Sequence, residues 1–195
     1  TVQVELADAV TAEEITAADD SDNSISGTSA PFDVEAGPVS ASRSAVSVRP
    51  DTATANGTDA AVLQVELADA NGNAIGGLTG SGFSVSLSGD AGLDGPVSET
   101  ETAGTYEADL TNTTAEDVTV TVEASGTTLN DTPTVTFEAG AAPAVTVATE
   151  PAPTTAGPPI AGPPAGEGTD AGGKPVSGGG VTAAEAGGYP LRGGT

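Results

Sequence analysis

The sequence predicts an all-β protein, an antiparallel β-sandwich with immunoglobulin-like (Ig-like) topology, from three observations. Apolar and polar residues alternate with period two in a series of short runs, as in half-buried strands. Turn-forming sequences separate these runs, and no stretch shows a helical period of useful length. Several short strands at this spacing indicate a sandwich or barrel, and Ig-like topology is the most common at about 100 residues.

The strands are expected in order along the middle of the chain, each defined by its alternating apolar residues. Turn signals such as Asp69–Asn73, which contains Asn-Gly, and Asp94–Pro96 divide them. We expect the apolar residues of these strands to form the core: Leu63, Val65, Leu67, Phe83, Val85, Leu87, Tyr106, Leu110, Val118, Val120, Val122, Val135 and Phe137.

Two internal similarities give conflicting repeat periods. The heptapeptide QVELADA occurs at Gln3–Ala9 and at Gln64–Ala70, which are 61 residues apart. A second pair, Phe32–Gly37 and Phe137–Gly140, has the same order of an aromatic closing strand and a hinge of small residues, and its glycines are 103 residues apart. The longer period fits one sandwich. We therefore interpret Gly37 and Gly140 as joints between units. Both heptapeptides are then strands, but they occupy different positions in the strand order of their units.

These joints predict tandem repeats with incomplete flanking units. Residues 1–37 would be the C-terminal half of a preceding Ig-like unit, with a strand at Val2, Val4 and Leu6 and a closing strand at Phe32. Residues 38–140 would be one complete sandwich. Residues 141–195 would start a further unit, but they are rich in Gly and Pro, and we expect them to be largely disordered. Half a sandwich cannot cover its own apolar face, so the flanking pieces should be poorly stable alone.

The charge excludes several classes of partner. The chain has 28 Asp and Glu against 4 Lys and Arg, so its net charge is −24. Binding to nucleic acid or to an anionic membrane needs clustered cations, which the chain lacks. Acidic residues alternate with apolar ones instead of forming blocks, which favours a folded protein adapted to high salt over a disordered one. No apolar run reaches membrane-spanning length, and no signal peptide is visible.

The residue types also argue against an enzyme. With no His and no Cys, neither Ser-His-Asp nor Cys-His catalysis is possible, and a Ser-Lys pair would need Lys174 in the Gly-rich tail. Paired carboxylates can cleave glycosides, but sugar sites also rely on aromatic faces, and aromatic residues make up only 3% of the chain. We predict no catalytic residues and no cofactor, apart from a possible calcium ion.

Two acidic loops are candidates for that calcium ion. Asp19, Asp20 and Asp22 cluster three carboxylates before Asn23, and oxygen ligands suit Ca²⁺. The alternative is a solvated loop, since the distal Glu of a complete calcium loop is missing. The stretch Asp69–Asn73 also carries oxygen ligands at alternate positions, but the interpretation we favour there is a hairpin turn.

Three sequences fit the N-glycosylation pattern, at Asn56, Asn112 and Asn130. All three fall in predicted turns, where a glycan could be accommodated if the protein is secreted. Chance matches are the alternative, because the chain is rich in Thr.

The stretch VRPDTATANGTDAAVLQVELADANGNAIGGLTGSGFSVSLSGD, with GTYEADLTNTTAEDVTVTVEASG and VTFEAG, resembles bacterial and archaeal Ig-like domains of the invasin/intimin type. The residues that carry the resemblance are Asn56–Thr58, Asp69–Asn73, Gly104–Tyr106 and the Val-rich strand after Thr114. With the acidic surface, the chain resembles a tandem-repeat cell-surface protein of haloarchaea.

The resemblance implies a non-enzymatic, extracellular structural or adhesive module that acts as a spacer and presents loops or glycans. Its partners would be neighbouring Ig-like domains of the same chain and an unidentified cell-surface protein or glycan. Two alternatives remain open: an Ig-like tail or decoration protein of a virus that infects halophiles, or an accessory domain of a secreted hydrolase.

Overall fold

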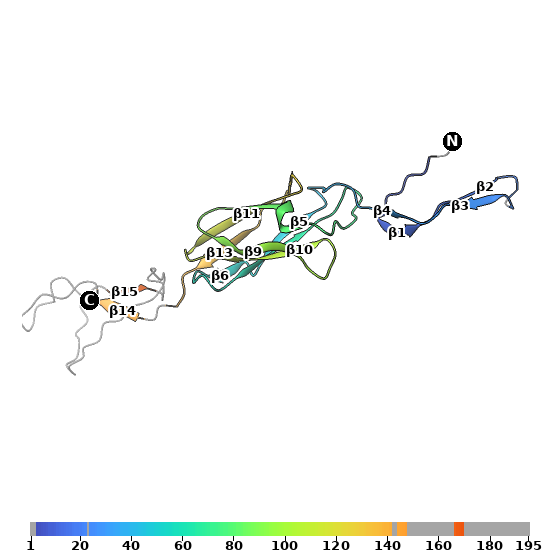
Figure 1. Ribbon diagram of the computed structural model, residues 1–195. Helices are drawn as coiled ribbons and strands as arrows, with labels where there is room; N and C mark the ends of the chain where they lie inside the picture. Colours follow the sequence, from blue (N-terminus) through green and yellow to red (C-terminus); the bar gives the residue numbers. More distant parts are fainter. Residues whose placement is uncertain (1–2, 23, 142–143, 148–165, 170–195) are drawn as a thin grey trace, which may run out of the picture.

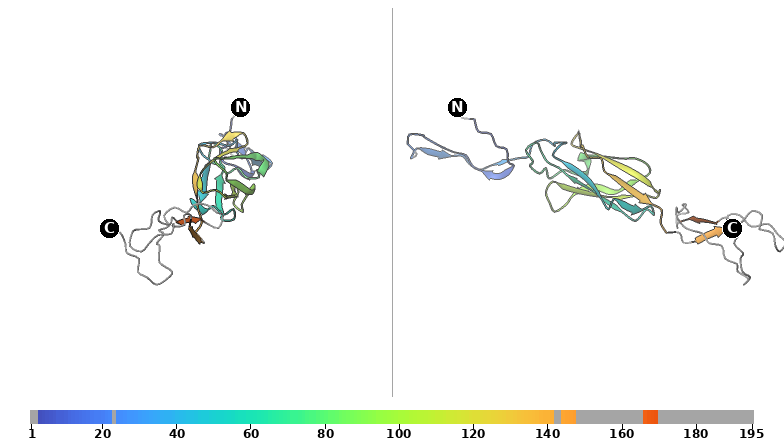
Figure 2. Two further views of the ribbon diagram at one scale, coloured as in Figure 1. Left: turned by 90° about the vertical axis from the view of Figure 1, so that its left-hand side faces the viewer. Right: turned by 180° about the vertical axis from the view of Figure 1, so that it is seen from behind.

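The computed structural model describes residues 3–22, 24–141, 144–147 and 166–169. A two-layer β-sandwich occupies the middle of the chain (Figure 1). Residues 3–37, which we call the arm, extend from one end of the sandwich, and a small two-stranded sheet lies beyond the other end. The view from behind shows the same elongated arrangement, and the view turned by 90° shows the sandwich end-on (Figure 2).

The first layer is a four-stranded antiparallel sheet in the order β5-β7-β10-β9. Its strands are β5 (Ala45–Arg49), β7 (Ala61–Glu66), β10 (Thr105–Thr111) and β9 (Gly92–Glu99). Strand β7 lies between β5 and β10, with Val65 opposite Val46 on one side and Tyr106 on the other. The period-two alternation of β7 therefore places one row of its side chains in the core and one row outside.

The second layer is built around β11 (Glu116–Ala124). It pairs with β13 (Thr134–Glu138), β8 (Phe83–Leu87) and the short β12 (Thr127–Thr128). Strand β6 (Thr52–Thr54) completes the sheet and runs parallel to β13, whereas all other pairs in the two layers are antiparallel. The chain changes layers between β5 and β6 at Arg49–Pro50, whose peptide bond is cis. A single 3₁₀ turn, Gly80–Gly82, precedes β8.

The core between the layers largely confirms the predicted set. Most of its predicted members are fully buried, but Phe83, Val85 and Leu87 of β8 are only partly buried, because β8 borders the sheet beside β11. The core also contains residues outside the predicted set, on or beside β5, β6, β7, β9, β10, β11 and β12: Val46, Val48, Ala53, Ala55, Ala61, Val97, Ala108, Ala124 and Leu129.

The arm differs from its prediction. It forms two consecutive strand pairs, β1 (Val10–Glu13) with β4 (Phe32–Val34), and β2 (Thr16–Ala18) with β3 (Ser26–Thr28). The closing strand at Phe32 is confirmed. The strand predicted at Val4 and Leu6 is wrong: residues 3–9 have no regular secondary structure, and these two side chains are 56% and 37% exposed. No described strand lies beside residues 3–9 to pair with them, so the alternating pattern has no sheet to join.

Beyond Gly140, β14 (Ala144–Val147) pairs antiparallel with β15 (Gly166–Thr169). Val145 and Val147 both belong to β14. Within the described residues, Gly166–Thr169 pairs with β14 alone. The expectation that residues 141–195 are largely disordered concerns mainly residues outside the described part of the chain.

Candidate functional site

The arm meets the domain at the turn Asp69–Asn73, which we call the joint turn. Asp69 is 2% exposed, and its carboxylate accepts four hydrogen bonds. Oδ1 accepts from the backbone N–H groups of Asn71 (2.9 Å) and Asn73 (2.9 Å). Oδ2 accepts from the backbone N–H of Gly37 (2.8 Å) and the side-chain amide of Asn73 (2.8 Å). The hairpin-turn interpretation is thus correct, and an acceptor with this many donors does not need a cation.

Asn73 reaches the other segment of the arm. Its Nδ2 donates to the carbonyl oxygen of Ala7 (2.7 Å), and its Oδ1 accepts from the backbone N–H of Ala9 (3.0 Å). This two-point contact has the pattern that a neighbouring strand would make with the same segment. Sequence reasoning missed it, because Asn73 and Ala7 are separated by 66 residues and no local signal connects them.

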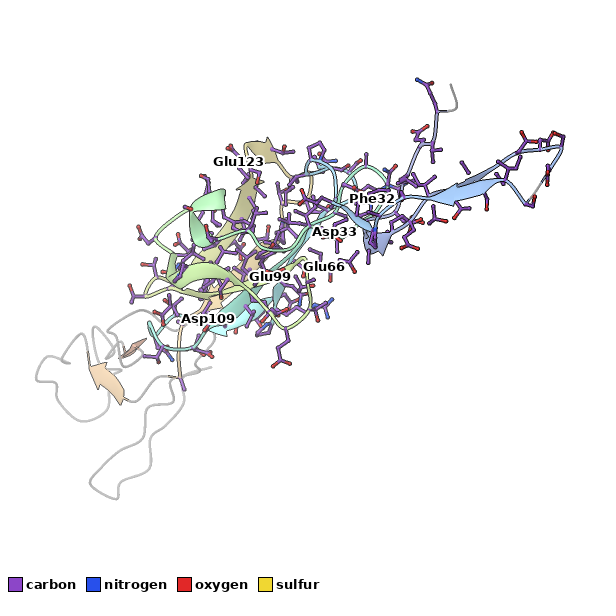
Figure 3. All side chains as sticks on the ribbon, turned by 45° about the vertical axis from the view of Figure 1, so that its right-hand side comes forward. Phe32, Asp33, Glu66, Glu99, Asp109 and Glu123 are labelled. Carbon is purple, nitrogen blue, oxygen red and sulfur yellow. The ribbon has the colours of Figure 1, made fainter. Side chains whose placement is uncertain are left out.

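A groove of about 890 Å³ lies between the arm and the loop that follows the joint turn. The arm contributes Val10 and Val34 to its walls, and the domain contributes Ala74 and Ile75. Figure 3 shows Phe32 and Asp33 on the arm beside the domain, and Glu66, Glu99, Asp109 and Glu123 along the surface of the domain. Apart from Asp33 in one wall, none of the charged groups labelled there lines the groove.

The loop between the joint turn and β8 is held to the domain by two further side chains. Glu99 accepts from the backbone N–H groups of Gly77 and Gly104, both at 2.8 Å. The Tyr106 hydroxyl donates to the carbonyl of Ile75 (2.8 Å) and accepts from the N–H of Leu78 (3.1 Å). Gly104 has a φ of +79°, and a Cβ there would lie 3.1 Å from the carbonyl oxygen of Leu67, so this position requires glycine. These hydrogen bonds therefore hold the loop that follows the joint turn in one position on the domain.

These hydrogen bonds shift the acid–base behaviour of the carboxylates. The side-chain amide of Asn73 and then the Gly37 N–H hold the pKa of Asp69 far below its usual range. The Gly104 and Gly77 amides lower the pKa of Glu99. Burial raises the pKa of Tyr106. A carboxylate with a lowered folded-state pKa contributes stability above its unfolded-state pKa of about 4, and that stability is lost as the pH falls toward the folded-state value.

We therefore expect the melting temperature of the chain to fall below about pH 4 when it is measured in molar salt. At low salt, acid would also stabilise the chain by removing the repulsion among its carboxylates. Molar salt screens this repulsion, so that the loss of the carboxylate hydrogen bonds determines the change. Asp69→Asn should lower the melting temperature at neutral pH, because the amide places its N–H donors against the backbone N–H donors. The further fall of the melting temperature below about pH 4 should be smaller in this variant than in the original chain. Glu123→Gln, on the exposed side of β11, is the control. If the melting temperature of Asp69→Asn fell with acid as steeply as that of the original chain, Asp69 would not be a source of the pH dependence.

The loop predicted to bind calcium uses its carboxylates locally. Asp19 Oδ1 accepts from the Ser21 N–H (2.8 Å), the Ser21 hydroxyl (2.5 Å) and the Asp22 N–H (3.0 Å). Asp22 Oδ1 accepts from the N–H and hydroxyl of Ser24, and Asp20 is exposed. In the part of the chain that the structure describes, no group of three such ligands is positioned for a metal ion. Asn23 lies outside that part, and calcium binding stays a prediction.

The three predicted glycosylation sites differ in their surroundings. Asn56 and Asn130 are exposed, in keeping with the expected turns. Asn112 is 2% exposed, its Nδ2 donates to Glu116 Oε1 (2.8 Å), and its Oδ1 accepts from the Thr114 N–H. A glycan on Nδ2 would displace the bond to Glu116. Glycosylation of the three asparagines stays a prediction.

Within the described residues, we find no helical segment whose length and hydropathy would let it span a bilayer.

Residues 40–140 match the protein family described as "Invasin, domain 3". Among curated protein sequences, none matches the chain significantly. Three solved structures are similar. Invasin, a bacterial integrin-binding protein, is 24% identical with a TM-score of 0.60, and the likeness covers 78% of this chain and 31% of invasin. FdeC, an adhesin of Escherichia coli, is 24% identical with a TM-score of 0.56 and coverages of 79% and 48%.

The third structure, InvD of Yersinia pseudotuberculosis, is 19% identical with a TM-score of 0.55, and the likeness covers 78% of this chain and 47% of InvD. At these identities the likeness shows a shared fold. The chain spans between about a third and a half of the length of these proteins. In each case the likeness extends over more of the chain than residues 40–140 alone.

Proposed function

Because this chain belongs to the family of invasin domain 3, we propose that it is a non-enzymatic, extracellular structural and adhesive module of a larger surface protein. The family match over the whole sandwich is the observation that carries this proposal. Two proteins with the same fold are described as integrin-binding and as an adhesin. The absence of His and Cys from the sequence is consistent with a module that acts by contact and not by catalysis.

The exposed apolar side chains of the arm support a tandem arrangement. Within the described residues, the large apolar side chains that remain exposed all belong to the arm: Val4, Leu6, Val10, Ile25 and Phe32. A stable unit covers such residues in its own core. We take the arm to be part of a preceding Ig-like unit, so that this domain is one segment of a row of units and acts as a spacer.

Function in concentrated salt is supported by the charge and by its placement in the sheet. Asp109 of β10 lies directly opposite Asp94 of β9, and two like charges at such a position destabilise a sheet in dilute solution. Molar salt screens this repulsion to within a few ångströms, at about 3 Å for 1 M. The net charge of −24 thus keeps the chain soluble, and the repulsion among these charges makes the fold depend on salt.

Surface labelling of cells that produce the parent protein tests the proposal. Antibodies raised against residues 38–140 are expected to label intact cells, and a protease added outside the cells should remove the signal. Labelling that requires permeabilised cells would overturn the extracellular assignment. Beads coated with the folded chain test the adhesive part: they should bind cells several-fold more than beads coated with an unrelated folded protein of similar net charge. Equal binding would leave only the spacer role.

A further inference from the structure

The contacts between arm and domain converge on two adjacent side chains of the joint turn. The arm reaches the domain through two segments, Ala7–Ala9 and Gly37. Asn73 binds the first segment at both a carbonyl oxygen and an N–H group. Asp69 binds the second segment at its N–H group. Because Asp69 Oδ2 also accepts from Asn73 Nδ2 (2.8 Å), the two contacts are linked into one network.

Apolar packing contributes little on the side of the joint where the groove lies. Val10 and Val34 of the arm stand across the 890 Å³ groove from Ile75 of the domain. Dispersion attraction falls off steeply with a gap of even an ångström, so side chains on opposite walls of a groove hold each other weakly. The orientation of the arm must then be set by contacts that are directional, and hydrogen bonds are strongly so.

We propose that the carboxamide of Asn73, oriented by the carboxylate of Asp69, is the contact that fixes the direction of the preceding unit relative to this domain. The partner surface is the backbone of that unit at Ala7–Ala9. The inference goes beyond a spacer role, because it states that the spacer is stiff at this joint and names the side chain responsible. Without the carboxamide, the arm stays attached through Gly37 but samples many directions.

Because Asp69 orients Asn73, the single carboxamide of Asn73 is enough to fix the direction of the arm. Four donors converge on the carboxylate, so the turn has little freedom, and Asn73 presents its amide in one direction. Losing both hydrogen bonds of Asn73 to the arm should reduce the equilibrium constant for docking roughly 5- to 150-fold.

Distances between two spin labels test the proposal on the purified full chain. The chain has no Cys, so the substitutions Ala18→Cys in the arm and Thr128→Cys in the domain create its only thiols. Both positions are exposed strand residues. Pulsed electron paramagnetic resonance in molar salt is expected to give one narrow distance distribution. Asn73→Ala should broaden it into a wide distribution, while the melting temperature shows that the domain remains folded.

Asn71→Ala is the matched control, because Asn71 lies in the same turn, is exposed, and contributes only its backbone N–H to the network. It should keep the narrow distribution. If Asn73→Ala fails to fold, Ala9→Pro removes the donor to Asn73 Oδ1 from the side of the arm. It should also broaden the distribution, but by less, because the bond from Asn73 Nδ2 to Ala7 remains. A distribution that is already broad without these changes, or one that stays narrow in both Asn73→Ala and Ala9→Pro, would overturn the inference. Neither result depends on adhesion or on localisation.

Discussion

Leu67→Ala is expected to lower the free energy of unfolding of the domain by about 2–5 kcal/mol, whereas Leu6→Ala should change it by less than about 1 kcal/mol. The two leucines occupy the same position in the two copies of QVELADA. Leu67 is 2% exposed within the core, and Leu6 is 37% exposed on the arm. Truncating the first leaves a cavity among residues that cannot collapse onto it, and truncating the second removes few contacts.

Urea unfolding in molar salt, followed by circular dichroism, measures both effects. The slope of the transition should stay constant, so that the midpoint alone reports the change in stability. Because the flanking residues are identical in the two copies, local sequence preferences are matched, and the difference between the variants isolates the effect of burial. Similar losses for the two variants would mean that the first copy is also part of a packed core.

Phe137→Ala is expected to cost about 3–5 kcal/mol, and Phe32→Ala less than about 1 kcal/mol. Each phenylalanine precedes a joint glycine by a few residues, which is why the sequence suggests equivalent closing strands. Phe137 lies on β13 between Glu116 of β11 and Ala53 of β6 and is 1% exposed. Phe32 lies on β4, whose one neighbour among the described strands is β1, and is 36% exposed.

The same denaturation experiment compares these two variants, and Phe137→Leu provides an intermediate case with a smaller change in volume. A loss for Phe32→Ala as large as that for Phe137→Ala would show that the arm folds as a packed unit with the domain. The expected difference instead supports an arm that lacks part of its own sheet, in agreement with the apolar residues that it exposes.

Much of the domain could be predicted because its determinants are local. Alternation with period two is a property of neighbouring residues, and it correctly identified Val118, Val120 and Val122 as one inward-facing row. The same reasoning missed Val46 and Val48 of β5 and Val97 of β9. The strand of Val97 contains Gly95 and Pro96, so its pattern is irregular. The residues of β5 alternate regularly, but the burial of Val46 and Val48 depends on the sheet beside them.

The joint could be predicted only in part. Asn-Gly within Asp69–Asn73 indicated a turn, and the turn is present. Its contacts with Gly37 and Ala7 depend on segments 32 and 66 residues away, and no spacing rule relates them. The buried Asn112 shows the same limit: a sequence motif reports residue types, whereas access to the side-chain nitrogen depends on the packing around Glu116.

The repeated heptapeptide separates what the sequence determined from what the tertiary structure decided. The sequence alone established that QVELADA has one apolar row and one polar row and so suits a strand. The tertiary structure decided that only the second copy contributes to one: its residues Gln64–Glu66 lie in β7, whereas the first copy has no regular structure. The reason is that the N–H and C=O groups of a strand need partners on neighbouring chains. Strands β5 and β10 supply them on both sides of the second copy, while the described contacts of the first copy include only the side chain of Asn73.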